Sequence, residues 1–165
     1  MRTLLLLVLL ASSAAAQNKA AIVAPPATCG PPTVNFDVKK EQTQPISEPE
    51  PGKALVYVLQ DNAHLTIRMG LDGDWIGANN GNSHFSFSVA PGEHHLCANW
   101  QSKMSEYSSL YSLANFTAEP GTIYYFRTRV WISEATLFFD LDPINSDEGR
   151  YMATTTLLAV SRPKK

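Results

Sequence analysis

The stretch HLTIRMGLDGDWIG, residues 64–77, decides the fold class of this chain. Its first eight residues alternate between apolar and polar side chains, which is typical of a strand with one buried face. The dipeptide Asp72-Gly73 follows, and this pair favours a two-residue hairpin turn. With this turn, Gly70 opposes Trp75, and Trp75 lies on the face away from the apolar residues. The stretch therefore predicts a β-hairpin with one outer face.

The predicted register of this hairpin also places a cation near an aromatic ring. Continuing the pairing sets Met69 opposite Ile76 and Arg68 opposite Gly77. Arg68 then lies diagonal to Trp75 on the outer face, within reach of a cation–π contact. Such a face meets solvent, the N-terminal part of the chain or a partner.

A second hairpin is predicted around the turn sequence Ala-Pro-Gly-Glu, residues 90–93. The strands 83–89 and 94–100 flank this turn, and their alternation separates an apolar face from a polar one. His84, His95 and Cys97 fall on the polar face. We therefore predict one outer binding face, which consists of Arg68, Trp75, His84 and His95.

The rest of the chain after residue 52 also consists of short apolar or alternating segments separated by turn residues. Residues 53–60 are apolar on both faces, as in a central strand, and residues 123–131 and 137–141 predict further strands. Residues 146–160 are ambiguous, because Ser146 can cap a short helix whereas the three threonines favour a strand; we predict the helix. The fold class predicted for residues 53–165 is all-β, an antiparallel β-sandwich of about seven to eight strands.

The N-terminal part predicts export. Residues 1–16 contain Arg2, an apolar run and a small-residue cleavage site, as in a secretory signal peptide. This run is too short to span a bilayer, so no membrane anchor is expected after cleavage. Residues 17–52 hold seven of the eleven prolines and predict an extended, Pro-rich arm. The predicted location is the periplasm or the extracellular space, as a soluble protein.

The chain has two cysteines, Cys29 and Cys97, and both lie after the predicted signal peptide. In an oxidising compartment a disulfide between them is expected. Two free thiols or half of a metal site are the alternatives. If the bond forms, it pins the Pro-rich arm across the outside of the sheet that carries Cys97.

Four blocks of sequence resemble one family. These blocks are GKALVYV (52–58), GLDGDWIGANNGNSHFSFSVAPGEHHLCANWQS (70–102), TAEPGTIYYFRTRV (117–130) and DEGRYMA (147–153). They resemble the exported bacterial family catalogued as domain of unknown function 2846. The segment LDGDWIG followed by VAPGEHHL is also similar to PEGA modules, small β-domains of bacterial envelope proteins. Both resemblances imply a fold and a compartment, and neither supplies catalytic residues.

The composition and the motifs leave two classes of function. A formal charge of −2 argues against non-specific nucleic-acid binding, and neither a G-x-S-x-G nor an HExxH motif occurs. The oxygen-rich residues after Asp72 lack the spacing of a calcium loop. The leading prediction is an exported, non-catalytic module without a cofactor, which binds an envelope component or a protein partner. The alternative is a small-molecule or metal-dependent enzyme that uses His84, His94 or His95.

Overall fold

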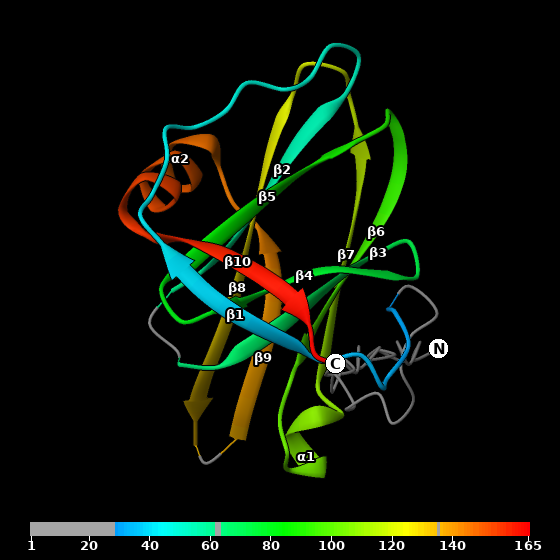
Figure 1. The fold of residues 1–165 in the computed structure, drawn as a ribbon, viewed down its shortest axis with the longest axis vertical. Coiled ribbons are helices and arrows are strands. Elements are labelled where there is room, and N and C mark those ends of the chain that lie inside the picture. Colours follow the sequence, from blue (N-terminus) through cyan, green and yellow to red (C-terminus); the bar gives the residue numbers. More distant parts are fainter. Residues whose placement is uncertain (1–28, 62–63, 135) are drawn as a thin grey trace, which may run out of the picture.

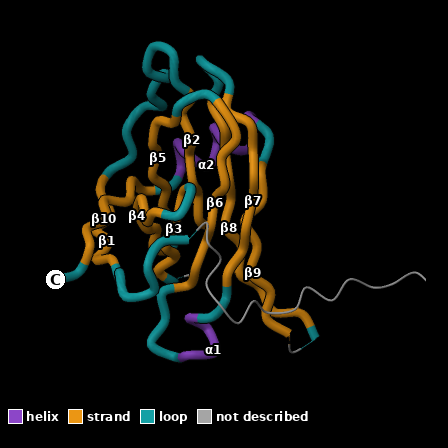
Figure 2. The backbone as a smooth tube through the Cα atoms, turned by 90° about the vertical axis from the view of Figure 1, so that its right-hand side faces the viewer, coloured by secondary structure: helices purple, strands orange, loops and turns teal. Residues whose placement is uncertain are grey.

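The computed structural model describes residues 29–61, 64–134 and 136–165. The predicted signal peptide, residues 1–16, and the first part of the predicted arm, residues 17–28, lie outside the described residues. The described residues form two sheets and two helices (Figure 1). Figure 2 shows the same strands in a view turned by 90°.

The six-stranded sheet has the order β1 (Phe36–Glu41), β10 (Leu157–Pro163), β5 (Ser83–Val89), β2 (Ala54–Gln60), β8 (Ile123–Ser133) and β9 (Thr136–Pro143). The four-stranded sheet has the order β4 (Asp74–Asn80), β3 (Thr66–Leu71), β6 (Gly92–Trp100) and β7 (Tyr111–Ala118). The helices are α1 (Ser105–Ser108) and α2 (Ser146–Thr155).

This architecture confirms the predicted all-β sandwich and differs from the prediction in two details. The described residues form ten strands rather than seven to eight. Two neighbouring pairs, β2 with β8 and β5 with β10, run parallel rather than antiparallel. Parallel neighbours need a long connection. Between β2 and β8 the chain forms β5 and all four strands of the other sheet. Between β5 and β10 it forms the elements from β6 to α2.

Strand β2 lies in the middle of the sheet, as its sequence predicts, and all seven of its residues are buried. Ala54, Val56 and Val58 belong to the core between the two sheets. The alternate residues Leu55, Tyr57 and Leu59 belong to a second core. That core lies under α2, with Met152 and Ala153 of the helix, so α2 covers part of the outer face of the six-stranded sheet.

The ambiguous C-terminal segment, residues 146–160, forms the predicted helix, α2, and then the alternative strand, β10. The helix is capped by Asn145, whose side chain accepts a hydrogen bond from the backbone N–H of Glu148, and not by Ser146 as predicted. Thr154 and Thr155 turn their hydroxyl groups back onto carbonyl groups of the helix. Such bonds compete with the backbone hydrogen bonds of the helix, and the chain becomes extended at Thr156.

The β3–β4 hairpin confirms the predicted turn. Asp72 and Gly73 both have positive φ, 51° and 100°, and Gly70 opposes Trp75. The register predicted beyond that pair is wrong, because a β-bulge shifts it by one residue. Met69 therefore opposes Gly77, and Ile76 is the extra residue.

The predicted hairpin of β5 and β6 is wrong. The two strands belong to different sheets, β5 beside β2 and β10, and β6 beside β3 and β7. The connection around Ala90 and Gly92 therefore crosses from one sheet to the other. The alternation assigned inner and outer faces correctly, since Phe85 and Leu96 both lie in the shared core. It did not determine which strands pair.

The predicted Pro-rich arm contains the first strand of the sandwich. β1 pairs along its whole length with β10 and forms one edge of the six-stranded sheet. Gln101 holds the start of this strand, since its side chain accepts from the backbone N–H of Phe36 at 2.7 Å and donates to the Phe36 carbonyl at 2.9 Å. The sandwich therefore begins earlier than residue 53.

Candidate functional site

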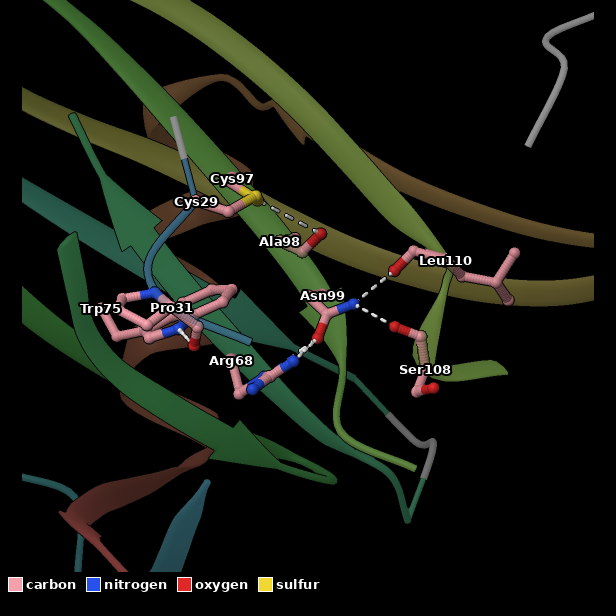
Figure 3. The surroundings of a disulfide bond; sticks show 9 residues. All are labelled: Cys29, Pro31, Arg68, Trp75, Cys97, Ala98, Asn99, Ser108 and Leu110. Atoms are coloured by element: carbon pink, nitrogen blue, oxygen red, sulfur yellow. Dashed lines mark hydrogen bonds between the residues drawn. A yellow bond between two sulfur atoms is a disulfide. The ribbon is translucent and has the colours of Figure 1, made fainter. Parts of the chain in front are cut away.

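The disulfide predicted from the two cysteines is present. Cys29 and Cys97 are bonded, with Cα atoms 5.3 Å apart. Cys97 is fully buried in β6, on the outer side of the four-stranded sheet, where the arm crosses it (Figure 3). The structure therefore confirms that Cys29 pins the arm to this face.

Trp75 lies under the arm. Its indole N–H donates to the carbonyl oxygen of Pro31 at 2.7 Å. Gly30 approaches the ring so closely that a Cβ atom at residue 30 would overlap it. The predicted cation–π contact is also present, with the Arg68 guanidinium carbon 4.6 Å from the ring centre. Of the three environments left open for this face, the N-terminal arm is the one that Trp75 meets.

Arg68 is a buried cation that binds neutral oxygens. Only 4% of the residue is exposed. Its guanidinium group donates to the carbonyl oxygens of Pro32 and Val34 and to the side-chain oxygen of Asn99. Burial lowers the pKa of Arg68 from its ordinary value, and Tyr111 acts in the opposite direction. Arg68 therefore fixes the arm through backbone carbonyl groups.

Asn99 completes this network, and the sequence did not single it out. The residue is fully buried, and its amide donates to the carbonyl oxygens of Ser108 and Leu110 at 3.0 and 2.9 Å. Its side-chain oxygen accepts from Arg68, so one amide links the loop after α1 to the arm (Figure 3). Alternation puts Asn99 on the predicted polar face with Cys97, two residues earlier, and this position was the available signal.

The four residues of the predicted binding face do not share one surface. His84 belongs to β5 in the other sheet, is 3% exposed and lies beside Tyr57. Its Nδ1 lies 2.9 Å from the hydroxyl group of Thr156, which itself donates to the helix α2 at Met152. Burial lowers the pKa of His84. The prediction failed because it rested on a β5–β6 pairing that does not form.

His94 joins two turns at one end of the sandwich. Its two ring nitrogens lie 2.7 Å from an Asp72 carboxylate oxygen and 2.8 Å from the Ala90 carbonyl oxygen. Both neighbours are acceptors, which suits a doubly protonated ring. Partial burial lowers the pKa of His94, but the hydrogen bonds to Asp72 and Ala90 outweigh it and raise the pKa above the ordinary 6.5.

The sign of this effect on stability follows from linkage. The folded protein holds the His94 proton more tightly than the unfolded chain, so His94 stabilises the fold below pH 6.5. The contribution is lost as the pH rises through the raised pKa of the folded state. The paired Asp72 side chain is 43% exposed, which limits the contribution to less than about 1 kcal/mol.

His95 is the exposed member of the predicted binding face. It lies on the outer face of β6 opposite Asn115 of β7. A shallow cavity of about 220 Å³ opens there, lined by His95, Leu96, Leu113, Ala114 and Asn115. Leu113, beside the disulfide, is 45% exposed. The three histidines of the alternative enzyme hypothesis therefore lie in different surroundings and do not converge on one site.

Among the residues that the structure describes, the largest group of exposed apolar side chains is on the β8–β9 hairpin. Trp131, Ile132 and Phe138 are 38%, 72% and 39% exposed. The rings of Trp131 and Phe138 stack with centres 5.1 Å apart, and the Arg129 guanidinium carbon lies 5.4 Å from the Trp131 ring centre. Figures 1 and 2 show the free end of this hairpin at the lower end of the molecule. Arg129, Trp131 and Phe138 lie on one face of the hairpin, and Ile132, the residue after Trp131 in β8, lies on the other face. We call these four side chains, on the two faces of one hairpin, the hairpin surface.

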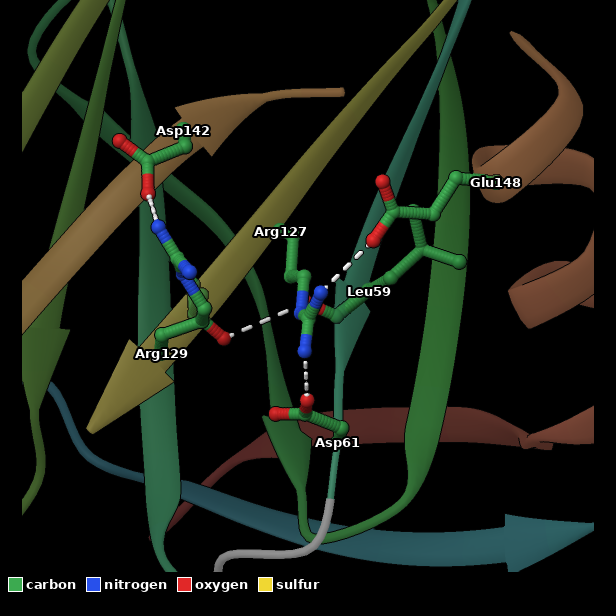
Figure 4. A network of polar contacts seen from close by, with 7 residues as sticks. Leu59, Asp61, Arg127, Arg129, Asp142 and Glu148 are labelled. Carbon is green, nitrogen blue, oxygen red and sulfur yellow. Dashed lines mark hydrogen bonds and ion pairs between the residues drawn. The ribbon is translucent and has the colours of Figure 1, made fainter. Parts of the chain in front are cut away.

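A polar network adjoins the hairpin surface (Figure 4). Arg127 pairs with Asp61, the residue after β2, and with Glu148 of α2 at 2.7 Å. Arg129 pairs with Asp142 of β9 at 2.7 Å. A cavity of about 320 Å³ lies at this network, lined by Asp61, Arg127, Arg129, Val130 and Trp131. Sequence analysis missed this site, although aromatic residues on both faces of the segment 123–131 were visible.

Among residues 29–61, 64–134 and 136–165, no group of three or more histidine, cysteine or carboxylate side chains is arranged to hold a metal ion. In the same part of the chain, no helix has the length and apolar character needed to cross a bilayer.

Comparison with protein-family models, with curated proteins and with solved structures finds no match to this chain. The fold and the site themselves define the class of protein, which is a β-sandwich with a disulfide-pinned arm and an exposed aromatic hairpin. The resemblance to the exported family of unknown function stays a prediction from the sequence blocks.

Proposed function

We propose that this chain is an exported, non-catalytic β-sandwich module that binds a protein partner through the hairpin surface. The observation that carries the proposal is the exposure of Trp131, Ile132 and Phe138 together on one hairpin. Clustered exposed apolar side chains mark interaction sites, and tryptophan and arginine are enriched among the residues that dominate binding energy.

The disulfide supports export to an oxidising compartment, because such bonds persist there and are rare in the cytosol. The predicted signal peptide and the resemblance to an exported family point the same way. The periplasm or the extracellular space thus remains our proposed location, and an envelope component or protein remains the proposed class of partner.

The proposal moves the interface from the predicted face to the hairpin surface. Trp75 and Arg68 already use their hydrogen-bond donors on the arm. Trp131 and Phe138 contact each other and leave more than a third of each residue exposed. The hairpin surface can therefore bind a partner without displacing any of the described residues.

The test is crosslinking and capture from the native envelope with two matched variants. In Trp131→Ala/Ile132→Ser the hairpin surface loses two exposed apolar side chains. In Tyr151→Ser an aromatic residue of α2 that is 69% exposed is lost instead. We expect the first variant to lose at least about tenfold in captured partner at an unchanged melting temperature, and the second to behave as wild type.

The same assay separates the two candidate faces. Full capture by Trp131→Ala/Ile132→Ser contradicts the proposal. If capture is instead lost in a Trp75→Ala variant that still folds, the face under the arm is the interface.

A further inference from the structure

The six-stranded sheet has an open edge within it. Within the described residues, β8 pairs with β2 only as far as Thr128, which lies opposite Gln60. Residues 129–133 of β8 continue past this point and pair only with β9. The two strands therefore extend as a two-stranded ribbon, and no described residue pairs with the other side of β8 there.

The cavity beside Trp131 lies along this edge. Its lining includes Arg129, Val130 and Trp131, three consecutive residues of one strand. Successive side chains of a strand point to opposite faces, so a cavity lined by all three runs along the strand rather than over one face. Asp61, which follows the last residue of β2, lines its other end. The cavity therefore lies between the residue that follows β2 and the unpaired part of β8.

The β1 edge of this sheet and the unpaired part of β8 differ in the side chains that discourage pairing with a further strand. At the far edge, β1 carries Lys39 and Lys40, and lysine on an edge strand discourages further pairing. In residues 129–133 of β8 the single charged side chain is Arg129, and Asp142 already engages it. Residues 136–139 of β9 are Thr-Leu-Phe-Phe, without a charge. Residues 130–133 of the unpaired part of β8 therefore carry no charged side chain that would discourage pairing.

The electrostatics of this region favour a cationic partner. Five carboxylates lie at the ribbon and its network, against two guanidinium groups, which gives a formal charge of −3. The acidic residues are Asp61, Glu134, Asp140, Asp142 and Glu148, and the basic ones are Arg127 and Arg129. The hydrogen bond to Asp142 raises the pKa of Arg129, and the charges of Asp140 and Asp61 add to this effect. An anionic polymer would be repelled here.

We infer that the hairpin surface binds an extended, lysine- or arginine-containing segment of a partner protein, which adds as a strand to the open edge of β8 beyond Thr128. This inference rests on the proposed function. Main-chain hydrogen bonds to β8 supply part of the affinity, and alternate side chains of the segment contact Trp131 on one face and Val130 on the other. Asp61 in the cavity and the carboxylates of the adjoining hairpin and helix, which together outnumber Arg127 and Arg129, favour a basic segment.

The test uses synthetic peptides of about eight residues, the length of an ordinary strand. One peptide alternates lysine and valine, and its matched control alternates glutamate and valine. Two further lysine–valine peptides carry backbone N-methyl groups, one on the odd and one on the even residues. Binding to the full, oxidised protein is followed by amide NMR shifts, with Glu134→Asn as the protein variant, since asparagine tolerates the positive φ of that turn position.

We expect the lysine–valine peptide to shift the amides of residues 129–133 and to bind at least about tenfold more tightly than the glutamate–valine peptide. One methylated peptide should lose binding and the other should keep it, because only alternate N–H groups of an added strand face β8. Glu134→Asn should weaken binding of the lysine peptide.

Four results of the peptide experiment overturn the inference. They are equal binding of both unmethylated peptides, equal binding of both methylated peptides, shifts confined to other residues, and no binding at all. A hairpin that shifts with protein concentration alone would make a second copy of this chain the occupant and would also overturn it. The Trp131→Ala/Ile132→Ser capture experiment is independent of these peptides, so the proposed function can survive their failure.

Discussion

Reduction of the Cys29–Cys97 bond is expected to destabilise the protein strongly while leaving the sandwich folded. In the folded state, residues 30–34 are also held by hydrogen bonds to Trp75 and Arg68, and β1 follows directly. In the unfolded state the bond joins positions that are 68 residues apart. The chain-entropy relation gives about 4 kcal/mol for a loop of that length. We therefore expect the free energy of unfolding to fall by about 4 kcal/mol.

The assay is equilibrium urea denaturation of the oxidised protein and of the same protein in reductant. The matched control is Cys29→Ala/Cys97→Ala, which should unfold like the reduced protein and should not respond to reductant. Alanine is preferred because Cys97 is fully buried, and a hydroxyl group there would lack a partner. The dependence of the unfolding free energy on urea should also steepen, since a reduced unfolded chain exposes more surface.

Two results would refute this reasoning. A fall of less than about 1 kcal/mol would show that the bond does not restrain the unfolded chain as a loop of this length should. Loss of cooperative unfolding in the reduced protein would show instead that the hydrogen bonds to Trp75 and Arg68 cannot hold the arm, and that the sandwich depends on the covalent link.

Three further substitutions test local features of the fold by thermal melts. Gly73→Val should cost more than about 1 kcal/mol, because a β-branched residue resists the φ of 100° in this turn; an unchanged melting temperature contradicts the hairpin. Gly149→Ala should destabilise by about 1–3 kcal/mol although alanine favours helix, because the added Cβ overlaps the Tyr125 ring; a more stable variant would show that α2 can shift. His94→Gln should lower the melting temperature most below pH 6.5 and progressively less above it, and a difference that grows with pH is the opposite outcome.

The local features of this fold could be predicted because each depends on a few neighbouring residues. The turn at Asp72 and Gly73 follows from the need for positive φ at both positions. The central position of β2 follows from apolar residues on both of its faces. The inward direction of Phe85 and Leu96 follows from alternation alone.

The pairing of strands could not be predicted in the same way. The alternation in β5 and β6 predicts which side chains face the core. This pattern is the same whether the two strands form one hairpin or lie in opposite sheets. The turn residues Pro91 and Gly92 permit both arrangements. The error moved His84 to the wrong surface, because a residue on the outer face of one sheet is remote from the outer face of the other.

The candidate site escaped prediction for a different reason. Trp131 belongs to a strand with aromatic residues on both faces, and such a strand is ordinarily buried. Its exposure arises because β2 ends at Gln60 while β8 continues to Ser133. The length of β8 relative to its neighbour is a property of two segments far apart in the sequence, so no local pattern reports it. Trp75 shows the converse, since its outward direction was predicted correctly and the arm then covers it. In a sandwich of this kind, the direction of a side chain follows from its own strand, whereas its availability to a partner is decided by where distant segments end.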